Sequence, residues 1–290
     1  MVFTNPSITN TLIDMYITPF SGIKNKTGKH KDWFNVEFIK IFCQQINPNN
    51  IYFKNAKFIN HYKANYSKLE LKERLNLIAD LVNDYCELSY QSKLKLFKPL
   101  LGKKLPFEKG MFTYCYQLYP VSQFIEKNGT QNIDHSLKFI KEITMRFTGE
   151  WAIRPLANFN QQKILAQMKN WATDKNFHVR RLASEGLRPR LPWGLKIDWV
   201  NKNPSKILPI YNKLRNDPIL YVRRSVANSM GDIVKIDEQL ALETFNKWLK
   251  QKKTAENLWV IRHAIRNPLK KETQKFIELN NKIKFYKSTL

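Results

Sequence analysis

The stretch ILAQMKNWATDKNFHVRR, residues 164–181, returns 43 residues later as ILPIYNKLRNDPILYVRR, residues 207–224. Six of the eighteen aligned positions are identical without a gap, and a weaker third copy contains Val260-Ile261-Arg262-His263. A period of about 40 residues with two helical patterns per unit is typical of HEAT-like repeats, whose hairpins must stack to bury their apolar faces. We therefore predict an all-α fold, a right-handed α-solenoid of stacked HEAT-like helical hairpins with a concave basic face.

Outside these repeats the chain separates into an arm and a helical region. Residues 1–31 include the basic run KNKTGKHK, residues 24–31, which has no apolar periodicity, and we expect an irregular basic N-terminal arm. From Asp32 onward apolar residues recur at helical spacing, with Asp32 as the expected N-cap of the first helix. We expect residues 32–290 to form a single helical-repeat domain.

Positive charge is the strongest compositional signal. The 290 residues contain 49 Lys and Arg against 24 Asp and Glu, which is a net charge of +25. This excess favours a polyanionic partner, and nucleic acid is the first candidate. The alternative is a solvated basic surface in a Lys-rich proteome, but the clustering of the arginines is less easily explained in that way.

Missing patterns argue against several classes of function. No run approaches the roughly 18 apolar residues that span a membrane, and residues 1–20 lack the features of a signal peptide. Cys43, Cys86 and Cys115 are odd in number and far apart, which argues against zinc and against a disulfide framework. Glycine-rich nucleotide loops and GxSxG are absent, so nucleotide hydrolysis and serine hydrolase chemistry have no support. We expect a cytoplasmic protein with no metal and no membrane contact.

The repeat helices carry a polar stripe that contains two acids. In the first repeat the stripe consists of His178, Arg181 and Glu185, and in the second it consists of Tyr221, Arg224, Asn228 and Asp232. In-register stacking places Glu185 and Asp232 on one shared face. A carboxylate on a surface that binds a polyanion weakens binding unless it has another function. The spacing leaves equally open that Glu185 merely pairs with Arg181 one helical turn away.

Arg180 and Arg223 occupy equivalent positions of the repeat but point away from the polar stripe. Asp174 and Asp217 also recur at the repeat period. We expect these arginines to connect one repeat to the next through these acids.

The linker RPRLPWG, residues 188–194, is basic, aromatic and stiffened by two prolines. It can place Trp193 against a base or a cation, and Arg188 and Arg190 against phosphates. The alternative, which composition alone slightly favours, is a capping loop with Trp193 in the core.

The segment RFTGEWAIRP, residues 146–155, contains a further acid. We expect Thr148 to cap a short helix that starts near Glu150 and stops near Pro155. Glu150 is then a first-turn acid favoured by the helix dipole, and spacing alone assigns it no catalytic role.

Together these segments resemble the AlkC family of bacterial DNA alkylation repair glycosylases, whose wider group includes AlkD, built on the same HEAT-like fold. The resemblance is carried by residues 146–155, by WATD and NFHVRRLASEG within residues 171–186, by the 188–193 loop, and by YVRRSVAN, residues 221–228. It extends from about residue 32 to residue 269, and it is densest and most specific between residues 146 and 232.

The resemblance implies a monofunctional glycosylase that hydrolyses the N-glycosidic bond of alkylated cationic bases, such as N3-methyladenine and N3-methylcytosine, and so initiates base excision repair. It implies double-stranded DNA containing alkylated bases as the partner, with no metal and no cofactor. The family's catalytic acids fall on Glu150, Glu185 and Asp232, and its lesion-contacting tryptophan falls on Trp193. Some relatives carry an immunoglobulin-like domain after the solenoid, and we expect no such C-terminal domain here. We expect a monomer, because terminal units close the core of a solenoid.

We expect DNA to be bound by polar and aromatic side chains of the repeats and the loop, namely Arg154, His178, Arg181, Arg188, Arg190, Tyr221, Arg224, Asn228, His263 and Arg266. Two other functions stay open. One is a non-catalytic HEAT-repeat nucleic-acid-binding protein, in which the acids are dispensable, and without the resemblance it would be the leading hypothesis. The other is a protein-binding scaffold, which predicts weak DNA binding without a steep salt dependence.

Overall fold

The computed structural model describes residues 18–24, 29–108, 114–251 and 253–288. Within these residues the regular secondary structure is entirely helical and no strand occurs, which confirms the all-α prediction. The chain divides into two compact units, Met1–Ala152 and Ile153–Leu290. Residues 1–17 and 25–28 of the predicted basic arm lie outside the described residues. The single domain over residues 32–290 stays a prediction.

The first unit consists of short helices around an aromatic core. Its α-helices are α2 (Ser21–Lys24), α3 (Val36–Ile46), α4 (Asn55–Asn65), α5 (Leu71–Tyr85), α6 (Tyr90–Leu96), α7 (Tyr119–Asn128) and α8 (Ile133–Thr144). In its core the rings of Phe34 and Phe38 lie 4.9 Å apart, and Tyr62 Oη donates a hydrogen bond to Phe34 O at 2.7 Å. Aromatic burial of this kind stabilises a unit whose helices are individually short.

The first long helix begins later than the sequence predicts. The side chain of Asn35 caps α3 by accepting a hydrogen bond from Phe38 N at 3.0 Å. Asp32 belongs instead to the 3-10 turn η1 (His30–Trp33), where its carboxylate lies 3.6 Å from Arg74. The expected N-cap at Asp32 is therefore wrong, because its carboxylate faces an arginine rather than the open N–H groups of a helix.

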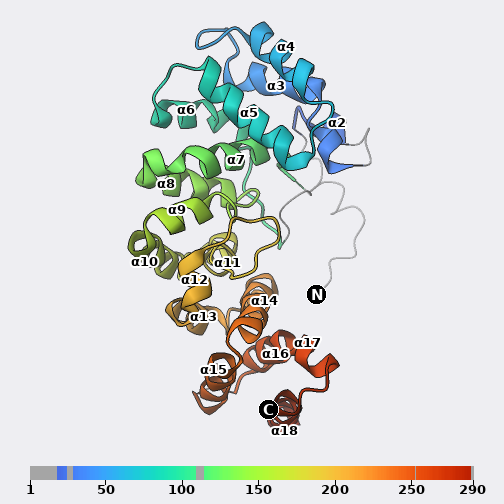
Figure 1. Ribbon diagram of the computed structural model, residues 1–290, viewed down its shortest axis with the longest axis vertical. Helices are drawn as coiled ribbons and strands as arrows, with labels where there is room; N and C mark the ends of the chain where they lie inside the picture. Colours follow the sequence, from blue (N-terminus) through green and yellow to red (C-terminus); the bar gives the residue numbers. More distant parts are fainter. Residues whose placement is uncertain (1–17, 25–28, 109–113, 252, 289–290) are drawn as a thin grey trace. The chain divides into compact units, whose positions relative to one another are not determined.

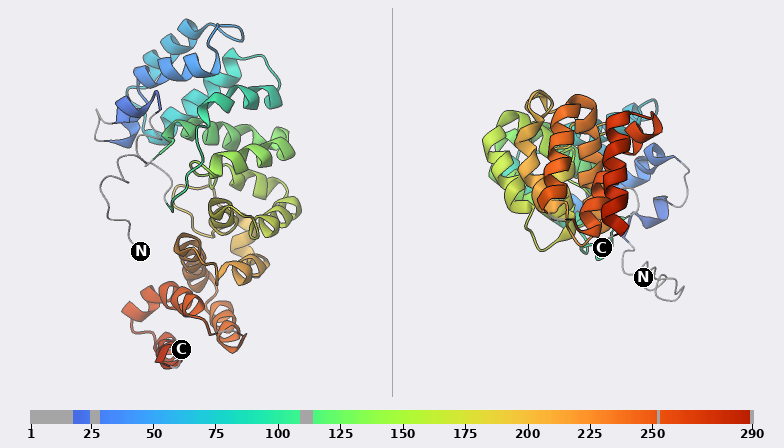
Figure 2. Two further views of the ribbon diagram at one scale, coloured as in Figure 1. Left: turned by 180° about the vertical axis from the view of Figure 1, so that it is seen from behind. Right: turned by 90° about the horizontal axis from the view of Figure 1, so that it is seen from below.

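The second unit contains the repeats. Its α-helices are α9 (Ile153–Phe159), α10 (Gln161–Trp171), α11 (Phe177–Glu185), α12 (Asp198–Lys202), α13 (Leu208–Leu214), α14 (Leu220–Ile236), α15 (Glu238–Gln251), α16 (Ala255–Ala264), α17 (Arg266–Lys270) and α18 (Gln274–Ser288). The three sequence copies correspond to the hairpins α10–α11, α13–α14 and α15–α16. Figure 1 shows these hairpins following one another along the second unit, and Figure 2 shows them from behind and from below.

The second helices of the hairpins form the interior of this unit, because α14 packs against α11 on one side and α16 on the other. Gly231 permits a close approach to α16, since a Cβ at this position would lie 3.0 Å from Ala264 O. Val222, Val226 and Ile233 of α14 are fully buried, as the apolar stripe of the repeat predicts.

The identical residues of the repeat form the same turn twice. Asp174 Oδ1 accepts a hydrogen bond from Asn176 N at 2.8 Å, and Asp217 Oδ1 accepts one from Ile219 N at 2.9 Å. The arginine six residues after each acid returns to it, with Nη1 of Arg180 and of Arg223 donating to Asp174 O at 3.0 Å and to Asp217 O at 2.6 Å. Each repeat therefore fixes the start of its second helix in the same way.

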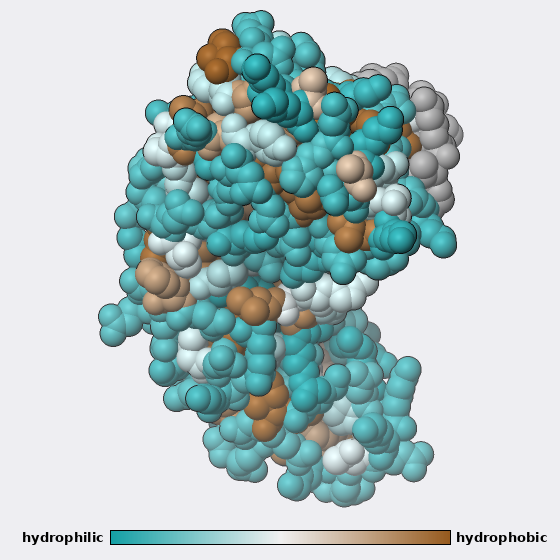
Figure 3. All heavy atoms as spheres, turned by 45° about the horizontal axis from the view of Figure 1, so that its top comes forward, coloured by the Kyte–Doolittle hydropathy of each residue, from teal (hydrophilic) through white to brown (hydrophobic). Residues whose placement is uncertain are grey.

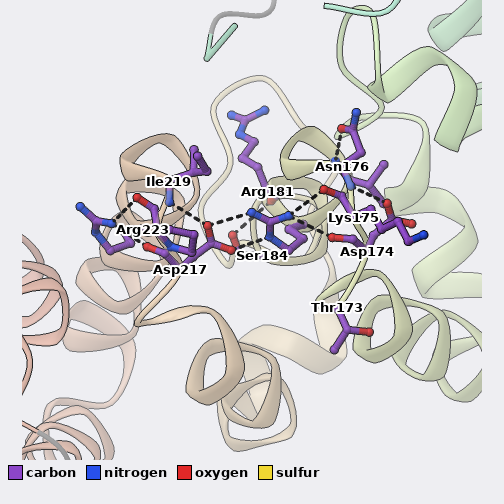
Figure 4. Close-up of polar contacts among 12 residues, drawn as sticks. Thr173, Asp174, Lys175, Asn176, Arg181, Ser184, Asp217, Ile219 and Arg223 are labelled. Carbon is purple, nitrogen blue, oxygen red and sulfur yellow. Dashed lines mark hydrogen bonds and ion pairs between the residues drawn. The ribbon is translucent and has the colours of Figure 1, made fainter. Parts of the chain in front are cut away.

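One of these arginines also connects two repeats, as expected. Arg180 Nε and Nη2 donate to Asp217 Oδ2 and Oδ1 at 2.5 and 3.0 Å, a two-point ion pair between successive hairpins. In Figure 4 Arg223 also reaches Asp217, whereas Arg181 points away from this network. Arg181 is thus left on the polar stripe, although it is the direct neighbour of Arg180 in the chain.

Replacing Asp217 with asparagine is expected to lower the free energy of unfolding by about 3 kcal/mol, because Arg180 then loses its partner in a partly buried place. The measurement is chemical denaturation of the purified protein. Asp237→Asn is the matched control, since the Asp237 carboxylate caps α15 through Leu240 N at 2.9 Å. Asp237→Asn should lower the free energy of unfolding by about 1 kcal/mol or less. An equal decrease in the free energy of unfolding of both variants would contradict a special role for the ion pair.

Candidate active site

Two acids from neighbouring repeats meet around one arginine. Arg188 Nε donates to Asp232 Oδ2 at 2.7 Å, and Arg188 Nη1 donates to Glu185 Oε1 at 3.2 Å. Asp232 Oδ2 also accepts a hydrogen bond from the backbone N–H of Arg190 at 3.2 Å. Glu185 ends α11 and Asp232 lies in α14, so the stacking brings both acids to one place, as the polar stripes predict.

Both acids are buried, with 5% of Glu185 and 4% of Asp232 exposed. Burial by itself raises the pKa of Glu185, but Arg181, Arg188 and a hydrogen bond with Ser225 together outweigh it, so this pKa lies below its ordinary value. The pairing of Glu185 with Arg181 exists at 3.7 Å, and it is longer than the contact with Arg188. Glu185 is therefore ionised at neutral pH.

Tyr211 lies close to both acids, and no sequence pattern identified it as a site residue. Burial raises the pKa of its phenol, the nearby Ser229 hydroxyl opposes this, and the charges of Asp232 and Glu185 raise it further. The equivalent position of the preceding repeat is Met168, 43 residues earlier, so no repeated residue type could have identified this tyrosine.

The loop after α11 exposes an aromatic side chain. Trp193 is 68% exposed, so its burial in the core, which composition alone slightly favoured, is wrong. Its φ of +58° lies in the left-handed region that a tryptophan rarely adopts. Leu195, two residues on, is 46% exposed. An exposed aromatic ring on strained backbone is a frequent feature of functional sites.

Arg154, expected to bind DNA, has a different position. Only 1% of it is exposed, and its guanidinium donates to Gly186 O at 3.1 Å, to Arg188 O at 2.9 Å and to Leu195 O. These carbonyls belong to the loop that carries Trp193. Since the buried guanidinium is engaged with this loop, we do not retain Arg154 as a DNA contact.

A basic strip extends along α11, α14, α16 and α17, and it is defined here by Arg181, Tyr221, Arg224, Asn228, His263 and Arg266. The Arg181 guanidinium lies over the Tyr221 ring, 5.1 Å from its centroid. Arg266 donates to Asn228 Oδ1 at 3.1 Å, and the Arg224 side chain is exposed. These contacts bring residues of separate helices into one surface that can face phosphates.

The two histidines predicted to bind DNA differ. His263 stacks on Trp259 with ring centroids 4.8 Å apart, and burial, together with the charges of Arg266 and Arg224, lowers its pKa. It is therefore neutral at pH 7 in the free protein. His178 is 2% exposed, and its ring centroid lies 5.9 Å from that of Tyr221, so it packs beneath the surface of the basic strip. We do not retain His178 as a direct DNA contact.

Arg224→Ala is expected to weaken DNA binding by about the same factor for all sequences, and to reduce the slope of log K against log salt by about 1. The measurement is a fluorescence anisotropy titration at several salt concentrations. Lys213→Ala is the control, because Lys213 is exposed on α13, the other helix of the same hairpin. An equal change of slope for both variants would mean that the basic strip is not a particular binding surface.

Glu150, the third predicted acid, belongs to the first unit and is 4% exposed. It precedes α9 instead of starting it, since α9 begins at Ile153 and continues through Pro155. Its N–H donates to Thr148 Oγ1 at 3.4 Å. Burial raises the pKa of Tyr119, and the charge of Glu150 raises it further, so the two side chains are neighbours.

The described residues contain no group of three or more His, Cys, Asp or Glu side chains arranged to hold a metal ion. None of the helices in this part of the chain is long and apolar enough to cross a membrane. The face drawn in Figure 3 is mostly hydrophilic, with apolar side chains in small separate patches.

No protein-family model matches the chain. The chain is 33% identical to the uncharacterized protein YhaZ of Bacillus subtilis (strain 168) over 250 residues, which covers 86% of this chain and 67% of YhaZ. It also superposes on the Pseudomonas fluorescens alkylpurine DNA glycosylase AlkC bound to DNA containing an abasic site analogue. That superposition has a TM-score of 0.75 and 30% identity, and it covers 87% of this chain and 68% of AlkC.

Proposed function

Because this chain belongs to the AlkC family, we propose that it is a DNA glycosylase that hydrolyses the N-glycosidic bond of alkylated, cationic bases in double-stranded DNA. N3-methyladenine and N3-methylcytosine are the proposed lesions. The observation that carries the proposal is the pair of buried acids, Glu185 and Asp232, which meet at Arg188 beside the loop of the exposed Trp193.

The proposed chemistry suits these groups. A base methylated at N3 is already a cation, so it leaves with the electron pair of the C1′–N bond without needing a proton from the protein. Positive charge then develops on the deoxyribose, and carboxylates held in a water-poor place stabilise it. A water molecule forms the new bond to C1′, and a carboxylate accepts its proton as general base.

Asp232 is the proposed general base. Its Oδ2 already accepts hydrogen bonds from Arg188 Nε at 2.7 Å and from the N–H of Arg190 at 3.2 Å. This arrangement orients the carboxylate and leaves Oδ1 to hold the water. Glu185, paired with Arg181 and Arg188, would mainly stabilise positive charge, and Glu150 is proposed as the third acid from the family resemblance alone.

Trp193 and the basic strip would provide the binding surface. The exposed Trp193 ring can attract a cationic base through its face. Arg181, Arg224, Arg266 and the exposed Arg190 are the proposed phosphate contacts. Arg188 is engaged with both acids in the free protein, so we propose that it acts on them and not primarily on phosphates. The protein would act as a monomer.

One observation favours a second candidate, the non-catalytic DNA-binding protein. Glu185 and Asp232 are buried and paired with arginines, and a purely structural ion network would have the same appearance. In that case the basic strip would bind DNA, and the acids would contribute only to stability.

Base release from methylated DNA distinguishes these functions. The purified protein is incubated with duplex DNA treated with a methylating agent, and the released bases are identified by chromatography. Release of N3-methyladenine or N3-methylcytosine above the spontaneous rate supports the glycosylase. Tight, salt-sensitive DNA binding without any release would leave the DNA-binding protein, and weak binding without a salt slope would favour the scaffold.

A further inference from the structure

The loop of residues 186–196 is connected at both of its ends to one buried side chain. Arg154 Nη1 donates to Gly186 O at 3.1 Å and to Arg188 O at 2.9 Å, at the start of the loop. Its Nε donates to Leu195 O, at the end of the loop. The guanidinium therefore closes the loop from within, and Trp193 lies on the closed segment.

The neighbouring residues of α9 continue this connection. Asn158, one helical turn after Arg154, donates from Nδ2 to Lys196 O at 2.8 Å. Ala157 O accepts a hydrogen bond from Trp199 Nε1 at 2.9 Å. One face of α9 is thus bound to the backbone of the loop through Arg154 and Asn158, and to α12, which follows the loop, through Ala157.

The loop is shaped to accept this arginine. A Cβ on Gly194 would lie 2.8 Å from Leu191 Cδ2, 3.1 Å from Arg154 Cδ and 3.2 Å from Arg154 Nε, so glycine lets the loop backbone pack closely on this arginine. The preceding residue, Trp193, takes its left-handed φ of +58° next to this contact. Strained backbone persists only where the surrounding structure determines it, and here Arg154 supplies the contacts.

Arginine suits this position for a physical reason. Its planar guanidinium offers five N–H donors in a fixed fork, so one side chain can reach carbonyls at both ends of the loop. A buried charge is costly unless it is well hydrogen-bonded, which makes an arginine that is 1% exposed informative. The loop positions two groups of the candidate site, namely Trp193 and the Arg188 side chain between the acids.

We propose that Arg154 is a positioning residue that presets the 186–196 loop, and through it the placement of Trp193 and Arg188, before DNA binds. This inference rests on the proposed function only where it concerns catalysis. The loop conformation can be tested without any activity, because the Arg190–Leu191 and Lys196–Ile197 bonds are trypsin sites inside or at the edge of the loop.

The test compares Arg154→Met and Arg154→Lys with the parent and with Arg74→Met. Arg74 is the matched control in the first unit, since it is 4% exposed and also donates to three backbone carbonyls, of Leu69, Lys31 and Ser67. Trypsin cleavage of the two loop bonds in the folded protein should be at least about tenfold faster in Arg154→Met, because proteolysis follows the population of the open loop. Arg74→Met should stay within about twofold of the parent.

The catalytic arm measures single-turnover base release and DNA affinity separately. Arg154→Met should lower the excision rate by about 100-fold, because a small misplacement of positioned groups has effects of this size, while DNA affinity changes by less than about threefold. Arg154→Lys should recover part of both properties. A purely structural role would instead lower thermal stability in both methionine variants and leave the excision rate of folded protein unchanged.

Two outcomes would overturn the proposal. The first is unchanged cleavage of both loop bonds in folded Arg154→Met. If this variant does not fold, Gly194→Ala replaces it, because the added Cβ crowds both Leu191 and Arg154 and so disturbs the packing of the loop on an intact Arg154. Unchanged cleavage of both loop bonds in Gly194→Ala is the second outcome. If the parent releases no base, the proposed function fails, but the proteolysis comparison still decides whether Arg154 presets the loop.

Discussion

Asp232→Asn and Glu185→Gln should each lower the excision of N3-methyladenine from duplex DNA by about 10²- to 10³-fold, the size expected for loss of a general base or of one charge-stabilising group. Both substitutions keep the shape of the side chain and remove its charge. The measurement is the single-turnover rate of base release with protein in excess. Asp232 should be the more sensitive position, because its Oδ1 is the proposed water contact.

DNA affinity provides the independent check on this prediction. Removing a negative charge beside a polyanion should leave binding unchanged or make it tighter. A slow variant that binds DNA at least as well as the parent is therefore a chemical defect and not a binding defect. Asp198→Asn is the matched control, since this acid lies in α12 with 69% of its side chain exposed. If all three variants excise the base at the parental rate, the acids have only a structural role.

Arg188→Met should make the stability of the protein depend on pH near neutrality, where this cluster leaves the parent insensitive. In the parent the folded pKa of Glu185 is lowered, so its contribution to stability is present above the unfolded pKa and is lost as the pH falls below about 4.5. Without Arg188, the pKa of Glu185 rises, because burial is then opposed mainly by Arg181. Loss of the shared arginine destabilises the variant by about 3–5 kcal/mol at pH 7, and proton uptake by Glu185 relieves part of this as the pH falls.

The melting temperature of Arg188→Met should therefore rise as the pH is lowered from about 8 to about 5. Over this range the cluster should change the melting temperature of the parent little. Excision by the variant should fall over the same range, because Glu185, which stabilises positive charge, becomes neutral. Thermal scans and single-turnover rates at matched ionic strength measure both effects. Arg190→Met serves as the control, since only the backbone N–H of Arg190 contacts Asp232. A variant as pH-insensitive as the parent would mean that Arg188 does not govern these acids.

Helical periodicity in the sequence predicted much of the fold and part of the candidate site. A repeat of 43 residues requires equivalent residues to take equivalent places, so the hairpins and the Arg180–Asp217 connection followed from spacing. The direction of a side chain around a helix depends only on its position in the helix. For that reason Glu185 and Asp232 could be assigned to one face before their contacts were known. The catalytic roles of these acids stay predictions.

Only the tertiary structure determined the burial and the contacts of the side chains in and around the 186–196 loop. The sequence expected Arg154 and His178 at the DNA surface, but both are buried, and it expected Arg188 on phosphates, but this arginine joins the two acids. The sequence was compatible with Trp193 either in the core or at the surface, and in the structure Trp193 is exposed. These outcomes depend on backbone carbonyls and carboxylates up to 44 residues away. No local periodicity encodes them, because a loop has no fixed angle between successive side chains and takes its shape from distant partners.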